Sequence, residues 1–118
     1  MASKKELREQ YKQMKFPMGV FQIRNIQNGK IFIESALNLN SIWNRHRTQL
    51  ELGMHPNQQL QQEWKEFGEQ AFAYEILSEL EQDDQQFSDP RRELKKLEQL
   101  FIEEKQPFGE KGYHITKK

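Results

Sequence analysis

The sequence predicts an α+β fold, a small three-stranded antiparallel sheet flanked by helices and preceded by an extra N-terminal helix. Three observations predict it. An Asn-Gly pair separates two β-rich runs, helical periodicity follows over residues 38–67, and a third β-rich run precedes a last amphipathic helix. A chain of 118 residues suits one core of this kind. We therefore expect a single domain over residues 18–118, with a helix over residues 1–17 that packs on the domain or leads into it.

The first two strands are predicted to form a hairpin. Residues 20–25 and 30–34 are rich in β-formers and flank Asn28-Gly29, which is the strongest short-range signal for a tight hairpin turn. Side chains alternate between the two faces of a strand. Alternation therefore places Phe21 with Ile23 on one face of the first strand, and Phe32 with Glu34 on one face of the second.

The helices are predicted from their caps and apolar spacing. Asn38 and Gly53 bracket one helical pattern, and Asn57 and Gly68 bracket the next. Residues 72–78 form the third β-rich run. Asp89-Pro90 then provides a capping carboxylate followed by proline at the first helical position, and the helix after it carries Glu98 within its apolar stripe.

Composition narrows the classes of function. Eighteen Lys and Arg balance eighteen Asp and Glu, so net charge gives no argument for nucleic-acid binding. The charges are unevenly spread, with seven basic and three acidic groups in residues 1–36 against eight and twelve in residues 69–118. No run reaches the roughly 18 apolar residues of a membrane span, so we expect a cytoplasmic protein without a membrane partner. Because the chain lacks cysteine, a metal would need carboxylates or the three histidines.

Several short motifs occur in the order found in one nuclease family. They are Gly-Val-Phe-Gln-Ile at 19–23, Asn-Gly-Lys at 28–30, Phe-Ile-Glu-Ser at 32–35, Trp-Asn-Arg-His at 43–46, Gly-Met-His at 53–55, Glu98, and Gly-Tyr at 112–113. With this spacing the chain resembles the GIY-YIG endonuclease superfamily from about residue 19 to residue 115. Its Lys- and Glu-rich first segment is similar to that of small stand-alone bacterial members.

The resemblance implies a reaction centre whose chemical groups have been replaced. In active members, two tyrosines, an arginine, a glutamate and often an asparagine surround the scissile phosphate, and a divalent metal, usually Mg²⁺, assists attack by water. The tyrosine positions match Phe21 and Phe32, which have no hydroxyl to hydrogen-bond a water. The glycine of the second triplet matches Glu34, the arginine matches Ile42, the asparagine matches His114 and the glutamate is retained as Glu98.

These replacements favour loss of catalysis. A positioned acid or base contributes about 10²- to 10⁴-fold, and a preorganised electrostatic donor about 10²- to 10³-fold. Our leading hypothesis is a GIY-YIG-like protein that has lost nuclease catalysis, needs no cofactor, and binds DNA, another nucleic acid or a protein partner. The alternative is a divergent Mg²⁺-dependent DNA endonuclease in which Glu98 holds the metal and Arg45, His46 or His114 replaces the missing groups. A second alternative is a protein-interaction module that uses the acidic connection over residues 79–89 or an exposed hydrophobic patch.

Individual residues have a structural interpretation beside the functional one. A carboxylate in an apolar stripe, such as Glu98, either binds a metal or pairs with a partner such as Arg45 or a tyrosine hydroxyl. His46 lies on the apolar side of its predicted helix, where packing is the simpler role. The predicted nucleic-acid contacts are Arg24, Arg45, His46, Arg47 and His55.

Overall fold

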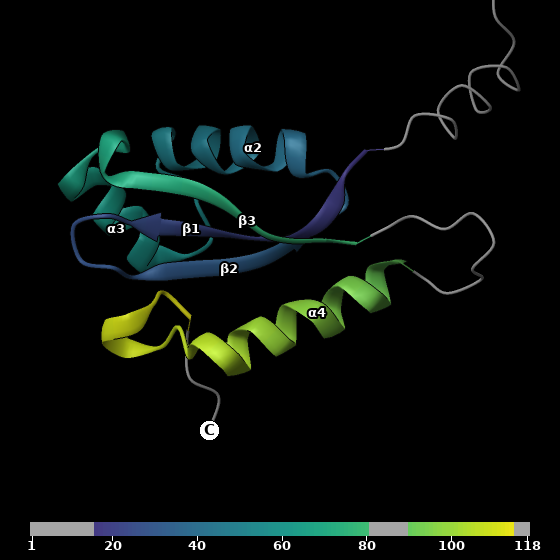
Figure 1. The fold of residues 1–118 in the computed structure, drawn as a ribbon. Helices are drawn as coiled ribbons and strands as arrows, with labels where there is room; N and C mark the ends of the chain where they lie inside the picture. The colour runs from purple at the N-terminus through teal and green to yellow at the C-terminus, as the bar shows by residue number, and fades with distance from the viewer. Residues whose placement is uncertain (1–15, 81–89, 115–118) are drawn as a thin grey trace, which may run out of the picture.

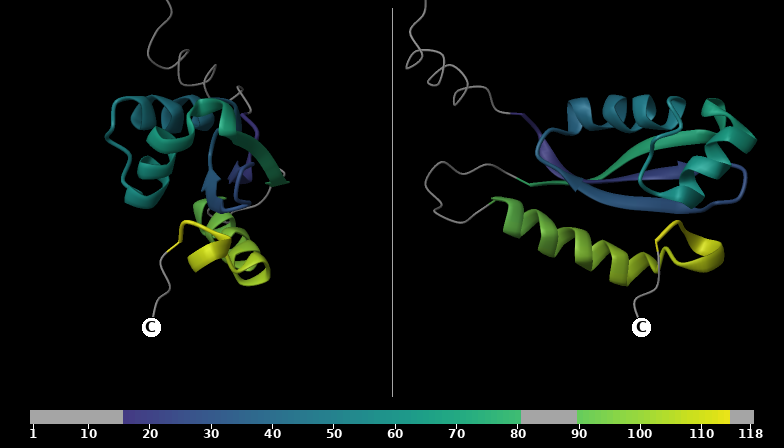
Figure 2. Two further views of the ribbon diagram at one scale, coloured as in Figure 1. Left: turned by 90° about the vertical axis from the view of Figure 1, so that its left-hand side faces the viewer. Right: turned by 180° about the vertical axis from the view of Figure 1, so that it is seen from behind.

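A three-stranded antiparallel sheet lies between two layers of helices in the computed structural model, which describes residues 16–80 and 90–114 (Figure 1). The chain runs through β1 (Met18–Asn25), β2 (Ile31–Ala36), α2 (Leu39–Glu51), α3 (Gln58–Phe67), η1 (Glu69–Ala71), β3 (Phe72–Leu80), α4 (Pro90–Lys105) and η2 (Gly109–Lys111). Helices α2 and α3 cover one face of the sheet and α4 covers the other (Figure 2). The predicted fold class is confirmed. The helix predicted over residues 1–17 lies outside the described residues except for its last two positions.

The sheet has the order β2-β1-β3, so the first strand of the sequence is the central one. In the β1–β2 register Phe21 lies opposite Glu34 and Ile23 lies opposite Phe32, which places all four side chains on one face. The turn between the strands follows the prediction, because Gly29 adopts a φ of +79° that other residues rarely take. The third strand is longer than the predicted 72–78 and extends to residue 80.

Local signals explain where the helices begin and end. The side chain of Asn38 accepts a hydrogen bond from the Asn40 N–H (3.0 Å), and that of Asn57 accepts one from the Leu60 N–H (3.0 Å). Both helices therefore start at the predicted caps. Leu94 on α4 is buried against the sheet, whereas the predicted cap at position 89 lies outside the described residues. No helix in the described part of the chain is long and apolar enough to cross a membrane.

A buried polar cluster ties the hairpin to α3 and to the C-terminal segment. Oε1 of Glu63 accepts hydrogen bonds from Asn25 (3.1 Å), Asn28 (2.6 Å) and the Tyr113 hydroxyl (3.0 Å), and its Oε2 accepts one from Lys30 (3.0 Å). Burial alone raises the pKa of Glu63, but the hydrogen bonds from Lys30, Asn28 and Tyr113 outweigh it and lower the pKa overall. The cluster fixes the turn end of the hairpin and thereby the face on which the candidate site lies.

Candidate functional site

Phe21 lies in the hydrophobic core and is fully buried. Its ring contacts the Tyr74 ring at a centroid distance of 5.3 Å and the His46 ring at 5.6 Å. Sheet packing requires glycine at position 19, two residues earlier, because a Cβ there would come within 2.0 Å of the carbonyl oxygen of Ser78 on β3. The first half of the motif therefore packs the sheet and offers no polar group to a substrate.

Phe32 is surrounded by three histidines. Its ring stacks on His114 with centroids 5.2 Å apart and planes 17° apart. The rings of His46 and His55 meet it edge to face, at 5.7 Å and 5.9 Å. Phe32 is only half-buried, so it also forms part of a cavity wall. The structure thus brings together three sequence-predicted residues from α2, the α2–α3 connection and the C-terminal segment.

A chain of hydrogen bonds leads from the α2–α3 connection to Glu34. The Asn57 N–H donates to Nδ1 of His55 (3.0 Å), so a neutral His55 carries its proton on Nε2. That N–H donates to Nδ1 of His46 (2.8 Å), and Nε2–H of His46 donates to Oε2 of Glu34 (2.5 Å). Burial and the neighbouring His46 lower the pKa of His55 to about 4. This series of hydrogen bonds begins at the backbone N–H of Asn57, which does not pass a proton on. The series can therefore orient the Glu34 carboxylate but cannot carry a proton beyond His55.

Three groups cover the outer edge of β2. The Ile33 N–H donates to Nε2 of His114 (2.8 Å), and the Ser35 N–H donates to Oε1 of Glu98 (2.8 Å). The Tyr113 N–H donates to the Ile31 carbonyl (3.0 Å). Burial lowers the pKa of His114, although the carboxylates of Glu98 and Glu34 oppose the shift. A neutral His114 with Nε2 as acceptor is the form that this hydrogen bond requires.

Glu98 has partners other than those expected from the sequence. Its Oε1 also accepts a hydrogen bond from the Ser35 hydroxyl (3.1 Å), and its Oε2 lies 3.5 Å from Nζ of Lys95. The expectation of Arg45 or a tyrosine hydroxyl as partner is wrong. Ser35 was missed because a backbone N–H at a strand edge leaves no signal in the sequence.

The groups nearest Glu98 add no carboxylate or carbonyl ligand for a magnesium ion. Mg²⁺ takes oxygen ligands in near-octahedral geometry, whereas the groups nearest this carboxylate are N–H, O–H and ammonium donors. The described residues contain no group of three or more His, Asp or Glu side chains placed to hold a metal ion.

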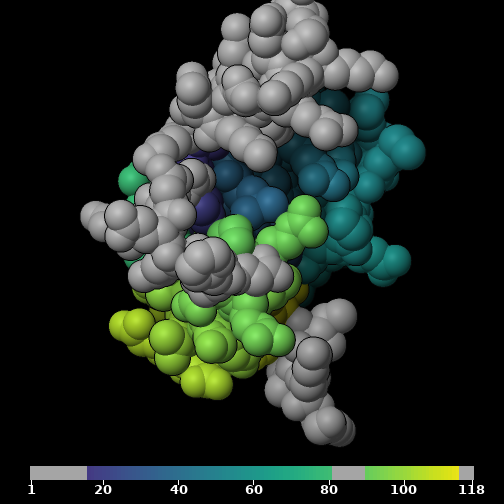
Figure 3. All heavy atoms as spheres, turned by 90° about the vertical axis from the view of Figure 1, so that its right-hand side faces the viewer, coloured from purple at the N-terminus to yellow at the C-terminus, as the bar shows by residue number. Residues whose placement is uncertain are grey.

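Two hollows meet at Glu34. The first, here called the basic groove, has a volume of about 410 Å³ and is lined by Asn38, Ser41, Ile42, Arg45, Arg91 and Lys95, together with Glu34. Figure 3 faces the end of the molecule where α2 and α4 begin, and blue atoms of β2 and α2 lie recessed there beside the green atoms of α4. The second, here called the amide pocket, has a volume of about 830 Å³ and is lined by Phe32, Glu34, Asn57, Gln58, Gln59 and Gln62, with His46 and His55.

Comparison with known proteins supports one family. No family model matches the chain. Intron-associated endonuclease 1 of Enterobacteria phage T4 is 36% identical over 62 residues, which is 52% of this chain and 25% of that protein, so the chain spans about a quarter of this relative. The solved catalytic domain of the homing endonuclease I-TevI matches with a TM-score of 0.70 at 28% identity, over 85% of this chain and 99% of that domain. A mutant of the same domain matches with a TM-score of 0.69 at 26% identity, over 86% and 95%. These matches support the resemblance of the chain to the GIY-YIG superfamily.

On this GIY-YIG fold the predicted arginines separate into two groups. Arg45 is exposed and lines the basic groove. Arg24 instead pairs with Glu75 (2.7 Å), and Arg47 pairs with Glu69 (3.4 Å), and neither lines the groove. Lys95 lines the groove and was not among the predicted contacts; its position three residues before Glu98 on one helix was the available signal.

Proposed function

We propose that this GIY-YIG domain binds nucleic acid and has lost the hydrolytic chemistry of its family. The supporting observation is the surroundings of Phe21 and Phe32, which stand where the family has its two tyrosines. Phe21 is fully buried among rings, and Phe32 stacks on His114. Neither position offers a hydroxyl to a water or a phosphate.

The charges at two further family positions also support the loss of catalysis. At the family's glycine position the Glu34 side chain is 37% exposed where the two hollows meet, so its carboxylate repels a phosphodiester at that position, whereas Arg45, Arg91 and Lys95 line the groove beside it. Ile42 lines the groove at the arginine position and supplies no positive charge to a developing anion. Glu98 is bound by Ser35 and Lys95, so the remnant of the family site serves here to hold β2.

The basic groove supports nucleic-acid binding. Arg45, Arg91 and Lys95 reach it from two helices. Asn38, the N-cap of α2, also lines it, and helix N-termini favour phosphate groups. The relatives are endonucleases by name, which supports a phosphodiester backbone as the ligand of this groove.

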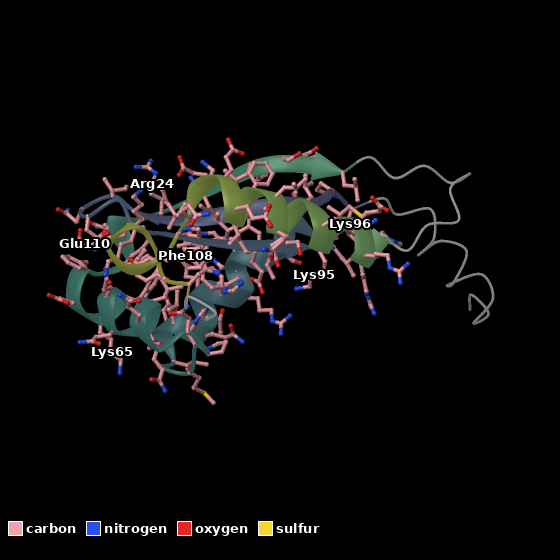
Figure 4. All side chains as sticks on the ribbon, turned by 90° about the horizontal axis from the view of Figure 1, so that it is seen from below. Arg24, Lys65, Lys95, Lys96, Phe108 and Glu110 are labelled. Carbon is pink, nitrogen blue, oxygen red and sulfur yellow. The ribbon has the colours of Figure 1, made fainter. Side chains whose placement is uncertain are left out.

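Binding is tested by fluorescence anisotropy of labelled DNA over a range of salt concentrations. Contact with two or three phosphates gives a slope of log K against log salt of about −2 to −3. Arg45→Ala and Lys95→Ala should each weaken binding and reduce the magnitude of that slope by about 1. Lys65→Ala is the matched control, because Lys65 lies on α3 and away from Lys95 (Figure 4). A slope near zero for the wild type would favour a protein partner instead.

Loss of catalysis is tested with single-stranded, branched and duplex DNA in the presence of Mg²⁺ or Mn²⁺. We expect no cleavage by the wild type. Restoring the family's groups as Phe32→Tyr, Glu34→Gly and Ile42→Arg in one variant should produce detectable cleavage if these positions account for the loss. Cleavage by the wild type that Glu98→Ala abolishes would instead establish the divergent Mg²⁺-dependent endonuclease.

A further inference from the structure

The two hollows that meet at Glu34 differ in chemistry. The basic groove carries Arg45, Arg91 and Lys95. Among the described residues that line the amide pocket, none is Lys or Arg. A phosphate therefore suits the groove, whereas the pocket suits an uncharged group with both hydrogen-bond donors and acceptors.

The groups in the amide pocket are available to such a ligand. Gln58, Gln59 and Gln62 are exposed at its wall, and no residue in the described part of the chain hydrogen-bonds to their side chains. Each amide can donate and accept. Glu34, which lines the pocket, is bound to His46 through Oε2, and no hydrogen bond from a described residue occupies its Oε1. Phe32 supplies an apolar ring beside these groups.

This combination matches a nucleobase. A base has an apolar face and an edge that alternates donors with acceptors, and proteins read exposed bases with amide or carboxylate groups beside an aromatic ring. The edge is free only when the base is unpaired, because in a duplex it is hydrogen-bonded to its complement. A volume of about 830 Å³ is ample for one base.

We infer that the amide pocket receives an unpaired base of a single strand whose phosphates lie in the basic groove, so that single-stranded nucleic acid is the preferred ligand. The inference rests on the proposed function, because it takes the groove as the phosphate site. Glu34, which lines both hollows, then lies between the base in the amide pocket and the phosphates in the basic groove.

The first experiment uses only the wild-type protein. Anisotropy is measured with a labelled single-stranded 12-mer DNA, its blunt duplex, and a strand of the same length made of abasic sites. We expect the single strand to bind at least about 10-fold more tightly than the duplex, and the abasic strand to lose that advantage. The affinity for an RNA strand of the same sequence, compared with that for the DNA strand, shows whether the protein prefers ribose or deoxyribose.

Variants then locate the base. Phe32→Leu should weaken binding of the single strand by roughly 5- to 150-fold. Gln58→Ala combined with Gln62→Ala should weaken it in the same direction, and these exposed positions carry little risk to folding. Gln70→Ala, an exposed glutamine on η1, is the matched control that should leave binding unchanged.

The outcomes separate the two proposals. Equal affinity for single strand, duplex and abasic strand would overturn the base pocket and leave the basic groove standing. Single-strand binding that neither Phe32→Leu nor the glutamine pair weakens would also overturn the pocket. Failure of all the probes to bind would overturn the proposed function itself.

Discussion

Acidification from about pH 7.5 to about pH 5 should destabilise the folded protein through His55. Its ring accepts the Asn57 N–H and donates to His46, which fixes the neutral form. Its pKa is lowered from 6.5 to about 4, so the unfolded chain takes up a proton in a pH range where the folded protein does not. The contribution of His55 is therefore fully present above about pH 6.5 and declines as the pH falls toward about 4.

Linkage gives the size of the effect. For these two pKa values, a single histidine accounts for a loss of about 2 kcal/mol in the free energy of unfolding between about pH 7.5 and about pH 5. Urea unfolding followed by the fluorescence of Trp43 and Trp64, which contact each other in the fold, measures it. His114, with a pKa also lowered, adds a loss of the same sign in both wild type and variant. The comparison is with His55→Gln, which should lose about 2 kcal/mol less than the wild type over this range. Equal losses in the two proteins would refute the reasoning.

Substitutions at three further residues test structural roles. Glu63→Ala should lower the free energy of unfolding by about 2 to 4 kcal/mol, because buried Asn25 and Tyr113, half-buried Lys30 and exposed Asn28 lose their acceptor. Glu66→Ala, at an exposed position of the same helix, should change it by less than about 0.5 kcal/mol in the same urea titrations. Gly19→Ala should lower the melting temperature by several degrees, since the new Cβ would lie 2.0 Å from a carbonyl oxygen of β3, and an unchanged melting curve would contradict that packing. Glu98→Gln should retain stability because an amide oxygen can still accept the Ser35 N–H, whereas Glu98→Ala should cost about 1 to 2 kcal/mol, and equal losses would show that the charge itself matters.

The parts of the fold that were predicted from the sequence depend on neighbours in the chain. The Asn28-Gly29 turn and the caps at Asn38 and Asn57 are decided by backbone geometry within four or five residues, and all three occur where expected. The resemblance to the GIY-YIG superfamily is confirmed for the same reason, because ordered local motifs carry it. Whether residues 18–118 form the whole domain stays a prediction.

The parts that were not predicted depend on long-range hydrogen bonds. Periodicity placed His46 on the apolar side of its helix, but its bond to Glu34 depends on how α2 lies across β2. Periodicity also placed Glu98 in an apolar stripe without showing that a backbone N–H of Ser35 is its partner. The acidic connection proposed for protein binding lies largely outside the described residues. The pairing of Arg24 with Glu75 depends on the register between two strands, which the sequence did not specify.

The covered edge of β2 has a consequence for the nascent chain. Ile33 and His114 are 81 residues apart in the sequence, and Ser35 and Glu98 are 63 residues apart. The β1–β2 hairpin, in contrast, forms between strands that follow each other directly in the sequence. A hairpin forms within about 1 to 10 μs, but a ribosome adds only about 5 to 20 residues per second. The outer edge of β2 therefore stays open for roughly 4 to 16 s of synthesis before its last partner exists. Exposed strand edges are sites of intermolecular pairing, so substitutions near the C-terminus should influence how much newly made protein aggregates before it finishes folding.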